Sequence, residues 1–186
     1  MEMEKIAKVL ELLTLFSDAV IILLLIIFIS YIFSKKKKFL KSIARMSKNN
    51  YLEIGFIVAL VATLGSLFYS EVMGYTPCKL CWYQRILMYP QTIMFGLALW
   101  KKRTYLAIES VVLSLIGLII ASYHYLLQIG LVTSSNCDAV GYSSKCSEFF
   151  TLSYGYVTIP MMAATAFALL LLAGLIQLKY QGRRFF

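Results

Sequence analysis

The chain has 186 residues, 60% of them hydrophobic, and a mean hydropathy of +0.77. A soluble domain of this length cannot hide so large an apolar share in one core, so the composition predicts an integral membrane protein. The net charge is +9, but the basic residues form separate short runs along the chain. We therefore expect contacts with lipid headgroups and no nucleic-acid partner.

Five apolar stretches are each about 20 residues long, enough for a helix to cross roughly 30 Å of hydrocarbon. In chain order they are 13–34, 51–70, 82–100, 105–128 and 157–178. Their residues are continuously apolar, whereas the strands of a membrane β-barrel would alternate. The sequence thus predicts an all-α integral membrane protein with five spans in one membrane domain.

The basic residues indicate how these spans are oriented. Thirteen of the 18 Lys and Arg lie in three segments that alternate along the chain, 35–50, 101–103 and 179–184. By the positive-inside rule these segments face the cytoplasm, so the N-terminus lies outside and the C-terminus inside. The outer connections are then 71–81 and 129–156.

The N-terminal residues 1–12 have an amphipathic pattern, with Ile6, Val9 and Leu10 on one helical face. We expect this segment to lie along the outer membrane surface before the first span. Asp18 is the unusual residue of that span, and we expect it at a shallow position that reaches outer water.

All four cysteines lie in the two outer connections. Cys78 and Cys81 form a CxxC pair, and Cys137 and Cys146 lie in the longer loop. Thiol chemistry at a membrane surface is the leading interpretation. The alternatives are a structural zinc site with four cysteine ligands, whose spacing is loose, and two inert disulfides.

The residues around the CxxC pair favour redox chemistry. Thr76 is a typical N-cap and Pro77 a typical first helical residue, so both sulfurs should lie near the first turn of the third helix. Free backbone N–H groups and the helix dipole stabilise a thiolate there. Arg85 follows Cys81 by four residues on the same face, where a guanidinium needs an acceptor such as a thiolate, a carboxylate or a ligand oxygen.

These residues also carry a family resemblance. The run P-C-K-L-C-W-Y-Q-R at 77–85 resembles the P-C-x-x-C-x-Y-x-R signature of the DsbB/BdbC disulfide bond formation proteins. The run H-Y-L-L-Q at 124–128 resembles the family's H-x-x-L-Q, and Pro160 fits the proline that opens its last span. The resemblance covers about 51–180. It implies a DsbB-like four-helix membrane domain at 51–186, and leaves 1–50 as an amphipathic segment, an additional transmembrane helix and a basic loop.

The resemblance implies a quinone-dependent thiol oxidase in the cell membrane with its site on the extracytoplasmic face. A thioredoxin-fold, DsbA-like oxidase would form a mixed disulfide at Cys137, which frees Cys146. Electrons would then pass to Cys78 and Cys81, and on to a membrane quinone, either ubiquinone or menaquinone. Cys78 would be the better exposed of the inner pair and Cys81 the one facing the quinone.

Four further residues are candidates for quinone binding, and no metal is expected. Arg85 would stabilise negative charge on a quinone oxygen, and His124 would donate to the other oxygen. Trp82 and Tyr83 would line the ring, although aromatic residues at this depth are commonly membrane anchors. The rival functions are a vitamin K epoxide reductase-like quinone reductase and a non-enzymatic membrane protein with structural disulfides.

Overall fold

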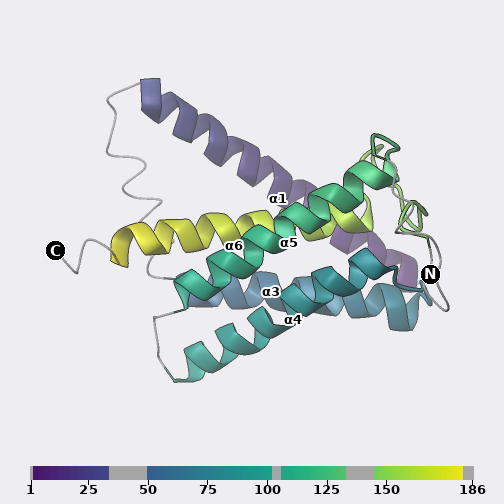
Figure 1. The fold of residues 1–186 in the computed structure, drawn as a ribbon, viewed down its shortest axis with the longest axis horizontal. Coiled ribbons are helices and arrows are strands. Elements are labelled where there is room, and N and C mark those ends of the chain that lie inside the picture. The colour runs from purple at the N-terminus through teal and green to yellow at the C-terminus, as the bar shows by residue number, and fades with distance from the viewer. Residues whose placement is uncertain (1, 34–49, 102–105, 133–144, 182–186) are drawn as a thin grey trace.

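The computed structural model describes residues 2–33, 50–101, 106–132 and 145–181, which are helical except for connections and one isolated bridge between Ser153 and Val157. The elements are α1 (Glu2–Phe33), α3 (Tyr51–Leu67), the π-helical turn η1 (Phe68–Val72), α4 (Lys79–Trp100), α5 (Ala107–Gln128) and α6 (Ile159–Gln181) (Figure 1). The predicted all-α class is confirmed. Within the described residues, three helical segments are long and apolar enough to cross a membrane, namely Tyr51–Val72, Ala107–Gln128 and Ile159–Lys179. The five-span count and the orientation stay predictions.

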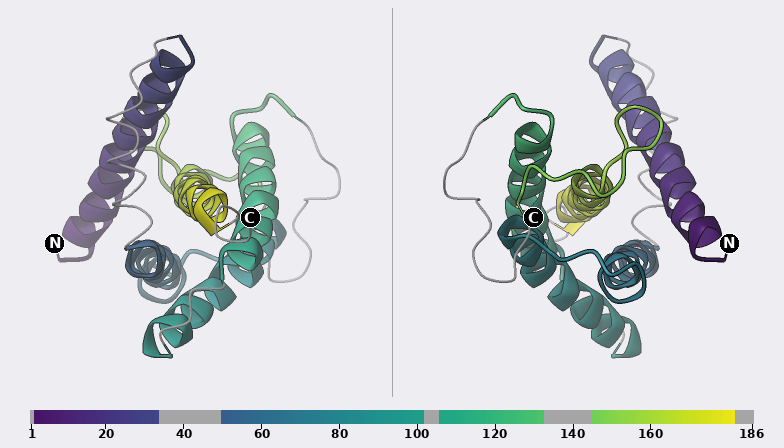
Figure 2. Two further views of the ribbon diagram at one scale, coloured as in Figure 1. Left: turned by 90° about the vertical axis from the view of Figure 1, so that its left-hand side faces the viewer. Right: turned by 90° about the vertical axis from the view of Figure 1, so that its right-hand side faces the viewer.

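Helices α3, α4, α5 and α6 lie side by side, and α5 packs most extensively against α6 (Figures 1 and 2). Two fully buried rings, Phe95 and Phe167, lie directly over Gly55 and Gly117, where a β-carbon would overlap the ring. Small residues at these crossings allow the helices to approach closely, as is typical of membrane helix packing.

A buried polar cluster joins α4 to α5. Gln91 is fully buried, and its side-chain oxygen accepts hydrogen bonds from Ser110 at 3.0 Å and Ser114 at 3.1 Å. Each of these groups would be costly in an apolar core without a partner, so the cluster specifies how the two helices meet.

Helix α1 differs from its prediction. Residues 1–12 and 13–34 were expected as a surface segment and a separate span, but Glu2–Phe33 is one continuous helix of 32 residues. Its first half packs against the bundle and its second half leans away (Figure 1). Asp18 is only 8% exposed and accepts hydrogen bonds from Thr165 and Tyr156, so the prediction of a shallow, water-facing position is wrong. The two hydroxyl donors make burial of the carboxylate tolerable.

One end of the bundle collects the polar connections. The N-terminus, η1, the start of α4, the end of α5 and residues 145–158 all lie there, while α6 ends at the opposite end (Figure 1). The two cysteine-bearing connections are therefore neighbours.

Candidate active site

The CxxC pair is positioned by the start of α4. Cys78 is the N-cap, with extended backbone angles of φ −78° and ψ 172°, and its sulfur accepts the backbone N–H of Cys81 at 3.3 Å. The predicted cap at Thr76 is therefore two residues too early. The physical reason is that the Cys78 sulfur satisfies the free amide of the third helical residue, a task that a hydroxyl usually performs.

The sulfur atoms are held in a buried cluster. Cys78 and Cys81 are free thiols whose Sγ atoms lie 3.1 Å apart, and Cys78 packs against Cys146. Cys146 is disulfide-bonded, and Cys137 lies outside the described residues. The expectation that Cys78 is the more exposed thiol is wrong: it is 2% exposed, because the segment around Cys146 covers it, whereas Cys81 is half-buried.

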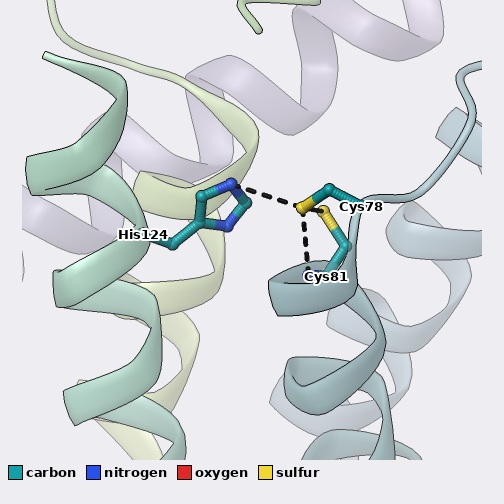
Figure 3. A group of neighbouring side chains, drawn as sticks. All are labelled: Cys78, Cys81 and His124. Atoms are coloured by element: carbon teal, nitrogen blue, oxygen red, sulfur yellow. Dashed lines mark hydrogen bonds between the residues drawn. The ribbon is translucent and has the colours of Figure 1, made fainter. Parts of the chain in front are cut away.

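His124, from α5, points at this cluster (Figure 3). Its Nε2 lies 3.6 Å from the Cys78 sulfur and 3.1 Å from the backbone oxygen of Cys146. Its Nδ1 lies 3.0 Å from the side-chain nitrogen of Gln84. Because a carbonyl oxygen only accepts, Nε2 carries a hydrogen, and Nδ1 accepts from the Gln84 amide. His124 therefore donates toward both cysteine-bearing segments at once.

This surrounding stabilises a Cys78 thiolate. The neighbouring Cys81 thiol first, and then the His124 ring, lower the pKa of Cys78 from 9.0 to about 4, although burial works in the opposite direction. Cys78 precedes the first turn of α4, where the positive end of the helix dipole also favours negative charge. At neutral pH this sulfur is therefore both a nucleophile and a good leaving group.

The same atoms bear on the zinc alternative. The ligand atoms of Cys78, Cys81 and His124 all lie within 4.8 Å of one another, which is compatible with three ligands of a soft metal ion. However, Nε2 of His124 is the atom nearest the sulfurs, and its hydrogen is directed to the Cys146 carbonyl. Metal binding through Nε2 would require the loss of both that hydrogen and that hydrogen bond.

Arg85 reaches away from His124, toward the end of α3. Its Nε donates to the Ser66 hydroxyl at 3.0 Å and its Nη2 to the Ser66 carbonyl at 3.1 Å. The guanidinium carbon also lies 5.3 Å from the centre of the Trp82 ring. The acceptor that the sequence required for this cation is thus supplied by Ser66, in the last turn of α3, two residues before the wider π-helical turn.

A cavity of about 320 Å³ opens beside Cys81. Arg85, Gln84, Ser66 and Tyr69 line it together with apolar side chains from α1, α3 and α6. The Tyr69 side chain is 4% exposed, and its hydroxyl has no hydrogen-bond partner among the described residues. A buried hydroxyl without a partner at a cavity wall indicates a group that a ligand satisfies.

The predicted site residues thus fall into two sets. Cys78, Cys81, Cys146 and His124 come together, and Cys81 and Arg85 share the cavity. Among the described residues that line this cavity, His124, Trp82 and Tyr83 are absent. Trp82 and Tyr83 are each 53% exposed on the outer surface of α4.

Sequence reasoning missed Gln84, Ser66 and Tyr69. Gln84 had a usable signal, because it is a polar residue one helical turn from the thiols in a largely apolar segment. Ser66 and Tyr69 had none, since they belong to a stretch interpreted as an ordinary span and reach the site through the π-helical turn.

A membrane helical bundle that packs a dithiol against a disulfide-bonded cysteine defines a class, the membrane thiol–disulfide oxidoreductases. The family model described as "Disulfide bond formation protein DsbB" matches residues 48–177. The chain belongs to this family, and its role is that of a membrane thiol oxidase.

Relatives agree with this assignment. The chain is 40% identical over 145 residues to a "Probable disulfide formation protein" of Oceanobacillus iheyensis, covering 78% of this chain and 99% of the relative. It is 42% identical over 120 residues to the "SPbeta prophage-derived disulfide bond formation protein B" of Bacillus subtilis, covering 64% and 80%. It is 38% identical over 122 residues to the "Disulfide bond formation protein C" of the same organism, covering 66% and 88%. No solved structure matches the chain.

Proposed function

We propose that this protein transfers electrons from an extracytoplasmic, DsbA-like thioredoxin-fold oxidase to a quinone in the cell membrane. The observation that carries the proposal is the position of the inner dithiol. Cys78 packs against Cys146, and Cys81 lines a cavity with Arg85 and Tyr69. The dithiol therefore lies between a second thiol couple and a space for a small acceptor.

The covalent steps balance as thiol–disulfide exchange. A thiolate of the partner attacks Cys137, breaks the Cys137–Cys146 bond and frees Cys146 as a thiolate. Cys146 then attacks Cys78 and breaks the Cys78–Cys81 bond, which frees Cys81. The partner's second thiolate displaces Cys137, which releases the partner with its own disulfide formed. Cys137 then attacks Cys146 and re-forms the outer disulfide, which releases Cys78, so two electrons of the partner have moved to the inner pair.

The state of the described cysteines fits the end of this exchange. Cys78 and Cys81 are free, and Cys146 is disulfide-bonded. The low pKa of Cys78, about 4, makes it a good leaving group when Cys137 closes onto Cys146. His124 donates to the Cys146 carbonyl, and the same nitrogen lies 3.6 Å from the Cys78 sulfur, so the ring holds the two segments in register for exchange.

The cavity beside Cys81 fits a quinone ring. A quinone supplies two carbonyl oxygens that take up two electrons and two protons as the Cys78–Cys81 disulfide forms. Arg85 places positive charge beside that position, and the Tyr69 hydroxyl offers a donor that has no partner among the residues that the structure describes. We assign donation to the acceptor to Arg85 and Tyr69, and we assign His124 to the sulfurs.

The direction of the site follows from charge. The thirteen basic residues of the three alternating segments favour the cytoplasm, and the cysteine-bearing connections share one end of the bundle with the N-terminus. On this basis the thiols face the extracytoplasmic side of the plasma membrane, where disulfides persist.

Quinone-dependent oxidation of dithiothreitol by the purified protein tests the acceptor. We expect oxidation only when ubiquinone-1 or a menaquinone analogue is supplied, and a loss of about 10³-fold or more in Cys81→Ser, because one member of a unit that acts together is gone. Ile93→Val is the control, because Ile93 is 65% exposed on the same helix and does not line the cavity, and it should retain full activity. Equal rates of dithiothreitol oxidation with and without quinone would contradict the proposal that quinone is the electron acceptor.

Trapping tests the partner. In Cys146→Ser the mixed disulfide at Cys137 cannot be released by attack from Cys146, so a covalent complex with a thioredoxin-fold protein should accumulate. The double variant Cys137→Ser/Cys146→Ser is the control and should trap nothing. If only disulfides within the chain are recovered, the cysteines act as structural links, and the proposal of a thioredoxin-fold partner is wrong.

A further inference from the structure

The buried stripe of helix α1 is mostly polar. Among its described side chains, the most buried recur at heptad spacing, and three of these four are polar: Ala7, Glu11, Thr14 and Asp18, each 7–9% exposed. Large apolar residues on the other face point away from the bundle and are 47–68% exposed: Met3, Ile6, Val9, Leu12 and Phe16. This arrangement is typical of a helix whose outer face meets lipid.

Contacts at Asp18 and Leu10 fix the first half of α1 on the bundle. Asp18 accepts hydrogen bonds from Thr165 on α6 at 2.6 Å and from Tyr156 at 3.2 Å. On the other side, Leu10 lies over Gly65 of α3, where its methyl group is 3.4 Å from the position of an added β-carbon. The helix therefore bridges α3 and α6.

The bridge borders the cavity at Cys81. Leu10, Leu13, Thr14 and Ser17 of α1 line it, and Cys81 and Arg85 line it from α4. Thr165, whose hydroxyl binds Asp18, lines the same cavity from α6. The anchoring contact and the cavity wall are thus parts of one structure.

This wall lies outside the segment that the family model matches, which begins at residue 48. Helix α1 ends at Phe33. The helix is therefore an addition to the family's four-helix domain, and it adds side chains to a cavity that the matched helices also line.

We propose that α1 is a wall of the acceptor site, and that Thr14 and Ser17 limit the size of the ring that binds beside Cys81. The proposal rests on the proposed function, because it takes the acceptor to be a lipid quinone. Asp18 is a positioning residue that holds the wall through Thr165.

Enlarging the wall is the first test. In Thr14→Phe the added ring projects into the cavity, so the Kd of ubiquinone-1, measured by quenching of tryptophan fluorescence, should rise about tenfold, and the KM with it. The two-ring head of a menaquinone analogue should lose more affinity than the one-ring head. Reduction of the inner disulfide by dithiothreitol without quinone should stay within about twofold of the parent, since the sulfurs are not touched.

Leu12→Phe is the matched control, because Leu12 is 53% exposed on the outward face of the same helix. It should leave the Kd and the ring preference unchanged. Ser17→Phe is a second variant at the wall, where the side chain is only half-buried, and it should repeat the effect of Thr14→Phe.

Labelling of the unaltered protein avoids any question of folding. A photoactivatable ubiquinone analogue should modify the tryptic peptide of residues 9–35, and excess ubiquinone-1 should suppress the labelling. Labels confined to α3, α4 and α6, with unchanged Kd values in both wall variants, would overturn the role of α1 while quinone-dependent activity persisted. A parent protein that neither binds nor reduces quinone would instead refute the proposed function itself.

Discussion

The two sides of the Cys78–Cys81 pair differ in how they are filled. On the His124 side, the imidazole nitrogens, the Gln84 amide nitrogen and the Cys146 carbonyl all have partners at 3.0–3.1 Å. On the Arg85 side there is a cavity of about 320 Å³ and a buried Tyr69 hydroxyl without a described partner. Exchange between disulfides requires that the reacting sulfur atoms are held in contact. A ligand that binds and dissociates requires an open cavity with hydrogen-bond donors that have no other partner nearby.

This difference between the two sides also separates the roles of Arg85 and His124, which the sequence analysis had placed together. Arg85 and His124 were both assigned to the acceptor, but Arg85 binds Ser66 and lines the cavity, whereas His124 contacts Cys78 and does not line it. Substitutions on each side should therefore have different signatures, one in acceptor binding and one in sulfur chemistry.

Among substitutions that keep all four cysteines, the largest effect is expected at Arg85. Arg85→Ala should lower kcat/KM for quinone about 10²-fold, because a fixed positive group beside the developing charge is lost. The kcat/KM of Arg85→Lys should fall between those of the parent protein and of Arg85→Ala, since lysine keeps the charge and loses the planar fork that binds Ser66. Steady-state kinetics with varied ubiquinone-1 measures this, and an unchanged quinone KM and kcat in Arg85→Ala would contradict the assignment.

Substitution of Tyr69 should have a smaller effect on quinone affinity, and it should lower this affinity without lowering the stability of the fold. Tyr69→Phe removes a donor that only the acceptor satisfies, so quinone affinity should fall about tenfold while the free energy of unfolding stays the same or rises by up to about 1 kcal/mol. Tyr51→Phe is the control, because Tyr51 is also a buried tyrosine of the same helical segment but does not line the cavity. A loss of affinity in both variants would show that the effect is not specific to the cavity.

The His124 side should respond in its pH dependence. Because the pKa of Cys78 is lowered to about 4, the contribution of its thiolate to folding stability is fully present above the ordinary thiol pKa and is lost as the pH falls through about 4. His124→Ala should move the midpoint upward, toward the ordinary value but short of it, because the larger effect of Cys81 remains. Thiolate absorbance of the reduced protein near 240 nm measures the midpoint; no upward shift would remove His124 from the stabilisation of the thiolate.

The fold was predictable where one physical signal dominates. The apolar runs at 51–70, 105–128 and 157–178 correspond to three spanning-length helices within a few residues, because transfer into hydrocarbon outweighs other local preferences. Helix α1 was harder. Its inward face is fixed by hydrogen bonds from Thr165 and Tyr156 to Asp18, and these residues are far apart in sequence. The local pattern of polar and apolar residues therefore does not indicate that the polar stripe is the buried one.

The candidate site was predictable in its chemistry and less so in its geometry. The spacing of Cys78, Cys81 and Arg85 along one helix is local information, and the structure keeps these residues together at the start of α4. The burial of Cys78 depends on residues around Cys146, and the position of Tyr69 depends on a π-helical turn. Both are products of tertiary packing.

The burial of Cys78 has a consequence for bypass reactions. At 2% exposed, this sulfur offers almost no surface to small thiols or oxidants dissolved in the surrounding water, although its thiolate would otherwise react with them readily. The neighbouring Cys146, which packs against it, gives reducing equivalents their direct route to this sulfur. Electron flow into the inner pair therefore depends on prior reduction of the outer couple, by a docked protein or by an added dithiol.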